Sequence, residues 1–119
     1  MNYYIHIKSC ITKMSYKEYK NIVHELPKYR NIKIKDNIIN ENDFTQEIAK
    51  KNYILINALD KDNVDLVIVL VNNVTGASNI GSMIYSFLKT GDSTYSVIII
   101  CDEKTKEAII KTGVKYDKF

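Results

Sequence analysis

Two continuous apolar runs stand out along the chain, and neither shows the alternation of a half-exposed strand. Asp65–Val71 reads Asp-Leu-Val-Ile-Val-Leu-Val, and Tyr95–Cys101 reads Tyr-Ser-Val-Ile-Ile-Ile-Cys. Runs of this length and β-branched composition predict strands that are covered on both faces. Tyr3–Ser9 is also rich in β-forming residues and predicts a first strand. Residues 32–35 alternate isoleucine and lysine, which predicts a half-exposed strand at a sheet edge.

Helical patterns lie between the predicted strands. Ser15 and Glu18 have the spacing of a capping box, and apolar residues recur behind them until Pro27. The pattern therefore predicts a helix that begins after Ser15 and ends at the proline. Further helices are predicted over residues 43–60, with Asp43 and Gln46 as the cap; over residues 78–90; and over residues 103–112, with Asp102 as the cap.

The order of these elements is βαβαβαβα, which implies a parallel sheet with right-handed crossovers. We therefore expect an α/β fold: a three-layer sandwich around a four-stranded parallel sheet, flavodoxin-like or Rossmann-like. A chain of 119 residues without linkers or repeats predicts a single domain over residues 1–119.

Composition and charge narrow the class of partner. The net charge is +3, the basic residues are spread along the chain, and Arg30 is the one arginine. Nucleic-acid binders concentrate basic charge on one face, so we expect no nucleic-acid partner. The N-terminus lacks the pattern of a signal peptide, and no apolar run is long enough to span a bilayer. The two cysteines have no metal or disulfide spacing, so the sequence predicts a cytoplasmic protein without a metal site or membrane contact.

Polar residues follow the predicted parallel strands, whose carboxyl ends meet at one edge of the sheet, where α/β proteins bind ligands. The loop after the third predicted strand carries amide and hydroxyl side chains and Gly76, and it leads into a helix whose N-terminus suits a phosphate or carboxylate. Simple capping by Thr75 or Ser78 explains part of the same pattern. The predicted ligand-binding residues are Ser9, Asn72, Asn73, Thr75, Gly76, Ser78, Asn79 and Asp102.

The sequence lacks the motifs of several known nucleotide-, flavin- and phosphate-handling proteins. The chain has no Walker lysine motif, and no Gly-x-Gly-x-x-Gly follows the first predicted strand. Asn72 stands where a response-regulator receiver has its aspartate, and Ser9-Cys10-Ile11-Thr12 lacks the glycine of a flavodoxin phosphate loop. We therefore expect no bound cofactor and assign no catalytic residue.

The segment Thr75-Gly76-Ala77-Ser78-Asn79-Ile80-Gly81 resembles the nucleoside 2-deoxyribosyltransferase-like family. In that family an acidic-led strand precedes a loop and a Gly-x-x-x-Glu-Ile/Leu-Gly helix start, and Ile80 and Gly81 fall in register with it. The resemblance implies a nucleoside or nucleotide pocket. Asn79 stands at the position of the catalytic glutamate, and a neutral amide is a poor nucleophile.

The same region resembles TIR-like domains, in which a similar strand precedes a Thr/Ser-x-x-Ser-x-x-x-x-Glu pattern. Thr75 and Ser78 fall in register with that pattern, and Met83 stands where catalytic TIR domains have their glutamate. A thioether cannot ionise, so this resemblance also implies a domain without the family's carboxylate.

These observations leave the function open between two main hypotheses. The first is a nucleotide- or nucleoside-binding domain with its site at the loop after the third predicted strand, which would be a divergent or inactive N-glycosidic-bond enzyme. The alternative is a non-catalytic, TIR-like interaction module that self-associates as a homo-oligomer. A small hydrolase or transferase that uses Cys10 or Asp102 is a third reading, and no nucleophile–base pair supports it.

Overall fold

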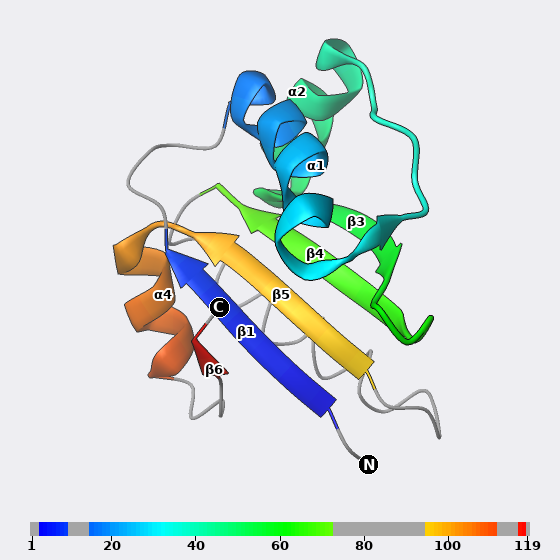
Figure 1. Cartoon of the computed structure of the whole chain (residues 1–119). Coiled ribbons are helices and arrows are strands. Elements are labelled where there is room, and N and C mark those ends of the chain that lie inside the picture. Colours follow the sequence, from blue (N-terminus) through cyan, green and yellow to red (C-terminus); the bar gives the residue numbers. More distant parts are fainter. Residues whose placement is uncertain (1–2, 10–14, 73–94, 112–116, 119) are drawn as a thin grey trace.

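The computed structural model describes residues 3–9, 15–72, 95–111 and 117–118, and within these ranges six strands form one sheet in the order β2-β3-β4-β5-β1-β6 (Figure 1). The strands are β1 (Tyr3–Ser9), β2 (Lys33–Ile34), β3 (Tyr53–Leu59), β4 (Asp65–Val71), β5 (Tyr95–Cys101) and β6 (Asp117–Lys118). The helices are α1 (Tyr16–Arg30), α2 (Glu41–Lys51) and α4 (Glu103–Ile110).

The sheet is mixed, so the predicted three-layer sandwich around a four-stranded parallel sheet, flavodoxin-like or Rossmann-like, is wrong. β4, β5, β1 and β6 pair in parallel, as predicted for the first three of these strands. β3 pairs antiparallel with both β4 and β2. The error arises at β3, whose residues the sequence placed inside a helix over residues 43–60.

The helix expected over residues 43–60 ends at Lys51 because Asn52 adopts a left-handed conformation, with φ 63°, and its N–H bonds the Ile48 carbonyl at 2.9 Å. The helix also starts earlier than predicted. Its N-cap is Asn40, whose Oδ1 accepts from the Asp43 N–H at 2.8 Å. Beyond Asn52, burial alternates along β3, as in a strand with one face on the core.

A tight turn joins β3 to β4 and fixes their antiparallel register. Asp60 Oδ1 accepts hydrogen bonds from the N–H groups of Asp62 and Val64, at 2.8 and 2.9 Å. Asn63 takes a positive φ of 61°, which asparagine tolerates better than most residues. This local turn favours a hairpin over a continued helix, because it satisfies the backbone groups that a helix would bond internally.

The start of α1 is confirmed and its predicted end is wrong. Ser15 Oγ accepts from the Glu18 N–H at 3.2 Å, as the capping-box spacing predicts. The helix runs through Pro27 to Arg30 and ends at Asn31, which has φ 53°. Leu26, next to the proline, is buried in the core, so packing holds the helix together despite the missing N–H.

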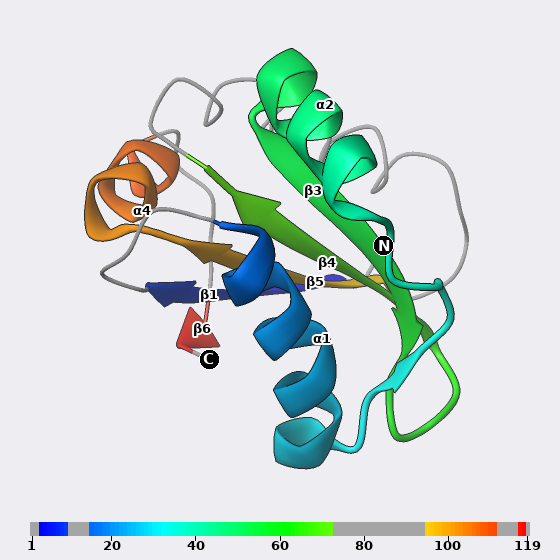
Figure 2. The ribbon, with the colours of Figure 1, turned by 90° about the horizontal axis from the view of Figure 1, so that it is seen from above.

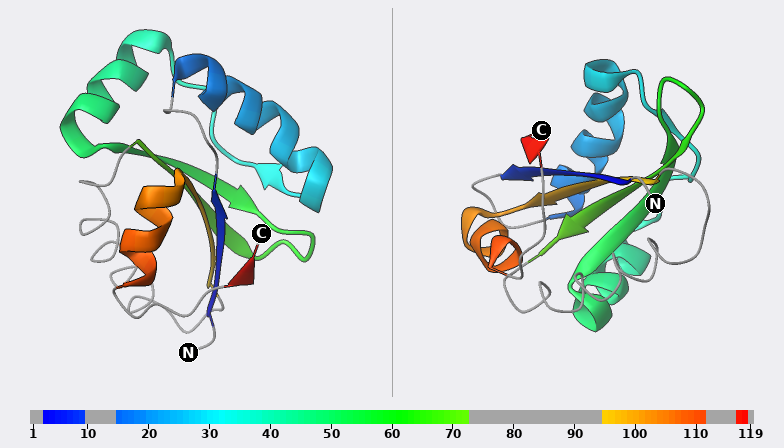
Figure 3. Two further views of the ribbon diagram at one scale, coloured as in Figure 1. Left: turned by 90° about the vertical axis from the view of Figure 1, so that its left-hand side faces the viewer. Right: turned by 90° about the horizontal axis from the view of Figure 1, so that it is seen from below.

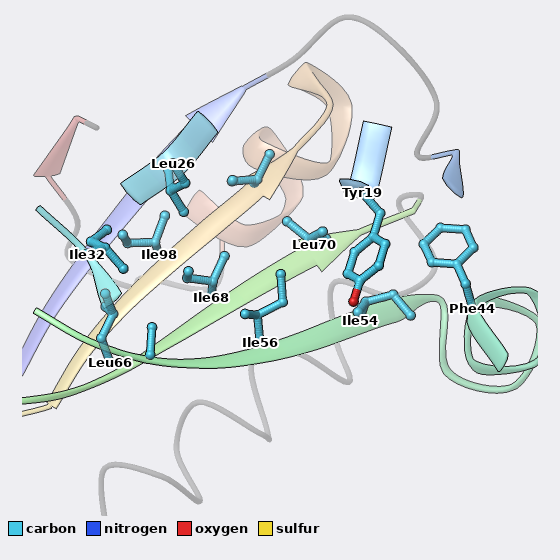
Figure 4. Close-up of a cluster of buried hydrophobic side chains, with 12 residues drawn as sticks. Tyr19, Leu26, Ile32, Phe44, Ile54, Ile56, Leu66, Ile68, Leu70 and Ile98 are labelled. Atoms are coloured by element: carbon cyan, nitrogen blue, oxygen red, sulfur yellow. The ribbon is translucent and has the colours of Figure 1, made fainter. Parts of the chain in front are cut away.

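Two buried clusters cover opposite faces of the sheet. On one face α1 and α2 pack on alternate residues of β3, β4 and β5, with α2 lying over β3 (Figure 2 and Figure 4). On the other face Ile109 of α4 packs on Val69 and Ile99. Figure 3 shows α4 on the opposite side of the sheet from α1. Within the described ranges, none of the helices is long and apolar enough to cross a membrane.

Two tyrosines of α1 hold the segment that leads into α2. The Tyr19 hydroxyl accepts from the Ile39 N–H at 3.1 Å, and the Tyr16 hydroxyl donates to the Ile39 carbonyl at 2.8 Å. Burial raises the pKa of the Tyr19 phenol above its ordinary value of 10.0. Phe44 of α2 packs against both tyrosine rings, with centroids 5.5 and 5.4 Å away.

Candidate functional site

The carboxyl ends of three neighbouring parallel strands meet at one edge of the sheet. The arrowheads of β1, β5 and β4 lie side by side in Figure 1 and point the same way. Ser9 at the end of β1 is in register with Cys101 at the end of β5, and Leu70 of β4 is in register with Ile100. The backbone therefore brings Ser9, Asn72 and Asp102 to this edge, as predicted.

The chain leaves two adjacent strands of this edge toward opposite faces. After β1 it continues to α1, which packs on the face that holds Leu70 and Ile98. After β5 it continues to α4, which packs on the face that holds Val69 and Ile99. Open α/β sheets bind ligands at a change of direction of this kind.

Asp102 holds the first turn of α4 at this edge of the sheet. Its Oδ1 accepts from the Thr105 N–H at 2.7 Å, and its carbonyl accepts from the Lys106 N–H at 3.0 Å, so the predicted N-cap is confirmed. The carboxylate already compensates the positive end of the α4 dipole. A second anion is therefore disfavoured at α4, and the remaining carboxylate oxygen suits a hydroxyl or amino donor.

Asn72 is fixed at the end of β4 by its backbone. Its N–H donates to the Asn52 carbonyl at 2.8 Å, which extends the β3–β4 pairing by one step. Its side-chain Oδ1 is buried and has no hydrogen-bond partner among the residues that the structure describes. A buried amide oxygen without a donor costs free energy, and a ligand N–H or O–H could satisfy it.

The remaining predicted site residues belong to one loop, which lies outside the described residues. These are Asn73, Thr75, Gly76, Ser78 and Asn79, together with the predicted helix over residues 78–90. Of the predicted residues, the structure therefore brings together the strand ends that carry Ser9, Asn72 and Asp102. Among the described ranges, no group of three or more histidine, cysteine or acidic side chains could hold a metal ion.

Thr105 is a residue of this region that the sequence reading missed. It is fully buried on the inner side of α4, and its Oγ1 has no hydrogen-bond partner within the described ranges. The signal was present, because Thr105 and Ile109 are four residues apart and share the buried stripe of α4.

Thr105→Val is expected to raise the free energy of unfolding by about 1 kcal/mol, because valine keeps the shape and removes an unsatisfied hydroxyl. Chemical denaturation of the variant and of the parent protein measures the difference. Thr105→Ser is the matched control, since it keeps the hydroxyl and loses the methyl group, and it should destabilise the fold. A destabilised valine variant would mean that the hydroxyl does have a partner.

Two hollows lie away from this edge, between β3 and the helices above it. One, of about 100 Å³, is lined by residues that include Tyr19, Ile38 and Ile39. The other, of about 280 Å³, lies between β3 and one side of α2. Neither includes Ser9, Asn72 or Asp102. In comparisons with known proteins, no family model and no curated protein matches the chain, so the candidate site rests on its own geometry.

Proposed function

We propose that the chain is a nucleotide- or nucleoside-binding domain whose ligand lies where β1, β5 and β4 end. The observation that carries this proposal is the divergence of the chain from β1 and β5 toward opposite faces. Two acceptor oxygens support it, because base amino groups and ribose hydroxyls are hydrogen-bond donors: Asn72 Oδ1, which has no partner among the described residues, and the Asp102 oxygen that does not cap α4.

The chemistry at this edge favours the nucleoside part of such a ligand near α4. Asp102 repels a phosphate at the α4 N-terminus, so a phosphate would have to bind away from α4. The resemblance to nucleoside 2-deoxyribosyltransferase-like and TIR-like domains supports a nucleoside pocket in a cytoplasmic protein. Since Asn79 and Met83 stand at the catalytic glutamate positions of those families, we propose binding and assign no cleavage of an N-glycosidic bond.

Asp102→Asn is expected to weaken nucleoside binding about tenfold, because the ligand loses a hydrogen bond to a charged acceptor. Asparagine caps helices as well as aspartate does, so the fold should keep its stability. Calorimetric titration with the common ribonucleosides and their 5′-monophosphates measures the affinity of both proteins.

The matched control is Asp62→Asn, which changes the same side chain in the β3–β4 turn, at the opposite end of β4. It should leave nucleoside affinity unchanged. Equal affinity of the Asp102→Asn variant and the parent protein would contradict a site at this edge.

A second candidate function is a non-catalytic, TIR-like module that self-associates. The observation that favours it is the position of β2 at one edge of the sheet, since an edge strand presents unpaired backbone groups that a second copy can pair with. Light scattering over a range of concentrations separates the two proposals. A monomer that binds a nucleoside supports the first, and an oligomer that forms with increasing concentration and binds none supports the second.

A further inference from the structure

Most of the outer edge of β3 is left open by β2. β2 pairs with β3 only at Leu59 and Ala58. The following residues bond Asn57: the Lys35 N–H donates to its carbonyl at 2.9 Å, and Asp36 Oδ2 accepts from its N–H at 2.7 Å. The chain then turns away to the tyrosines of α1 and into α2 (Figure 1).

The hydrogen bonds of β3 show which backbone groups face this open edge. Asn52 and Asp60 bond across to the β4 side, whereas Asn57 bonds outward to the β2 side. Because backbone direction alternates along an antiparallel strand, the N–H and C=O groups of Tyr53 and Leu55 point outward like those of Asn57. Beyond Asp36, no described residue pairs with them as a strand.

Both hollows lie along this open edge. Leu55 lines each of them, although its side chain packs in the cluster on the α4 face of the sheet. Its backbone is therefore the part that faces the hollows. Ile39 and Ile54 line both hollows as well, and Ile38 beside them is 50% exposed. An open edge flanked by apolar hollows is suited to an added strand and its alternate side chains.

The rim of the larger hollow is acidic. Asp43, Gln46 and Glu47 lie on one side of α2 and line it together with Ile39. Glu47 pairs with Lys51 at 2.9 Å, and the Asp43 carboxylate has no ion pair within the described ranges. A second copy of the chain would bring like carboxylates together, whereas a basic segment would complement them.

We propose that the Tyr53–Leu55 edge of β3 binds an extended segment of a partner protein that carries both apolar and basic residues on the face that lies toward α2. The segment adds a strand beside β3 and bonds the Leu55 N–H and C=O. Its apolar side chains fill the hollows over Ile39 and Ile54, and its lysine or arginine side chains meet Asp43. This binding is independent of the proposed nucleoside site.

The experiment uses the full chain and a short capped peptide with the repeat valine-serine-lysine-serine, which places valine and lysine on the same face of an extended strand. Binding is measured by fluorescence anisotropy, and amide hydrogen exchange is followed by NMR. In the complex the Leu55 N–H should exchange at least about tenfold more slowly, because it becomes bonded, while the Ile54 N–H stays equally protected with and without peptide. Asp43→Lys should weaken peptide binding about tenfold, and Asp62→Lys should not weaken it.

Two peptides methylated on the backbone separate strand addition from simple charge attraction. One carries N-methyl groups on every valine and lysine and the other on every serine, and only the one whose methyl groups face β3 should lose binding. Equal binding by both methylated peptides, or by a peptide with glutamate in place of lysine, would overturn the proposal. Protection of Leu55 that appears without peptide as the chain is concentrated would also overturn it, in favour of a second copy.

Discussion

Ile56→Pro is expected to unfold the domain, whereas Leu55→Pro is expected to leave it folded. The alternation along β3 directs the Ile56 N–H to β4, where Ile68 is its partner in register. Proline at this position removes a ladder hydrogen bond and places its ring against β4, at a cost of about 3 kcal/mol or more. The Leu55 N–H points to the open edge, where proline is tolerated.

Alanine variants serve as controls, because they measure how much stability is lost with the side chain alone. Ile56 is 2% exposed and Leu55 is half-buried, so each proline variant is compared with alanine at its own position. Urea denaturation gives the free energy of unfolding of all four proteins. The register is supported if the free energy of unfolding differs strongly between the proline and alanine variants at position 56 and only slightly at position 55. Equal differences would mean that this segment is not a strand paired with β4.

Phe44→Ala is expected to lower the free energy of unfolding by about 3–5 kcal/mol, since it empties an aromatic site that the surroundings cannot fill. Phe44 is 5% exposed and packs against the rings of Tyr16 and Tyr19. Figure 4 shows its ring beside that of Tyr19, above β3. The substitution affects three parts of the fold at once, because these rings connect α1, α2 and the segment at Ile39.

Phe44→Leu is the matched control for this cluster, because leucine keeps most of the buried volume. It should cost less than about 1.5 kcal/mol, as volume-conserving exchanges in cores do. The same denaturation measurement applies to both variants. A loss below about 1 kcal/mol for the alanine variant would mean that α2 does not pack on α1 through this ring, because a buried aromatic residue always costs more.

The strands that form continuous apolar runs in the sequence could be predicted from it. β4 and β5 are continuous runs of branched residues, and Asp102 follows β5 as a cap with the right spacing. β3 could not be predicted in the same way. Leu55, Ile56 and Leu59 also fit a helical stripe, and the pairing with β4 that makes them a strand is a tertiary interaction.

The ends of the helices show the same limit of local patterns. Pro27 normally ends a helix, and here the burial of Leu26 lets α1 continue for three more residues, to Arg30, before the left-handed Asn31 ends it. Asn40 rather than Asp43 caps α2, and since both residue types cap helices well, residue type alone does not decide between them.

The candidate site could be predicted as far as it depends on parallel strand ends. Ser9, Asn72 and Asp102 come to one edge because β1, β4 and β5 are parallel, which the sequence analysis expected. The chain leads from β1 and from β5 to helices on opposite faces of the sheet. This arrangement depends on the order of the strands, which local sequence patterns do not determine. The open edge of β3 was likewise hidden, because it depends on how soon β2 ends.

The most direct test of the proposed ligand site is a thermal unfolding screen of the purified chain against nucleosides, mono- and dinucleotides, NAD and cyclic nucleotides. A ligand at about a hundred times its Kd adds about 2.7 kcal/mol of stability, which is several degrees for a domain of this size. We expect such a shift with at least one nucleoside-containing compound, and its loss in the Asp102→Asn variant. A screen in which no compound raises the Tm would contradict the proposed function.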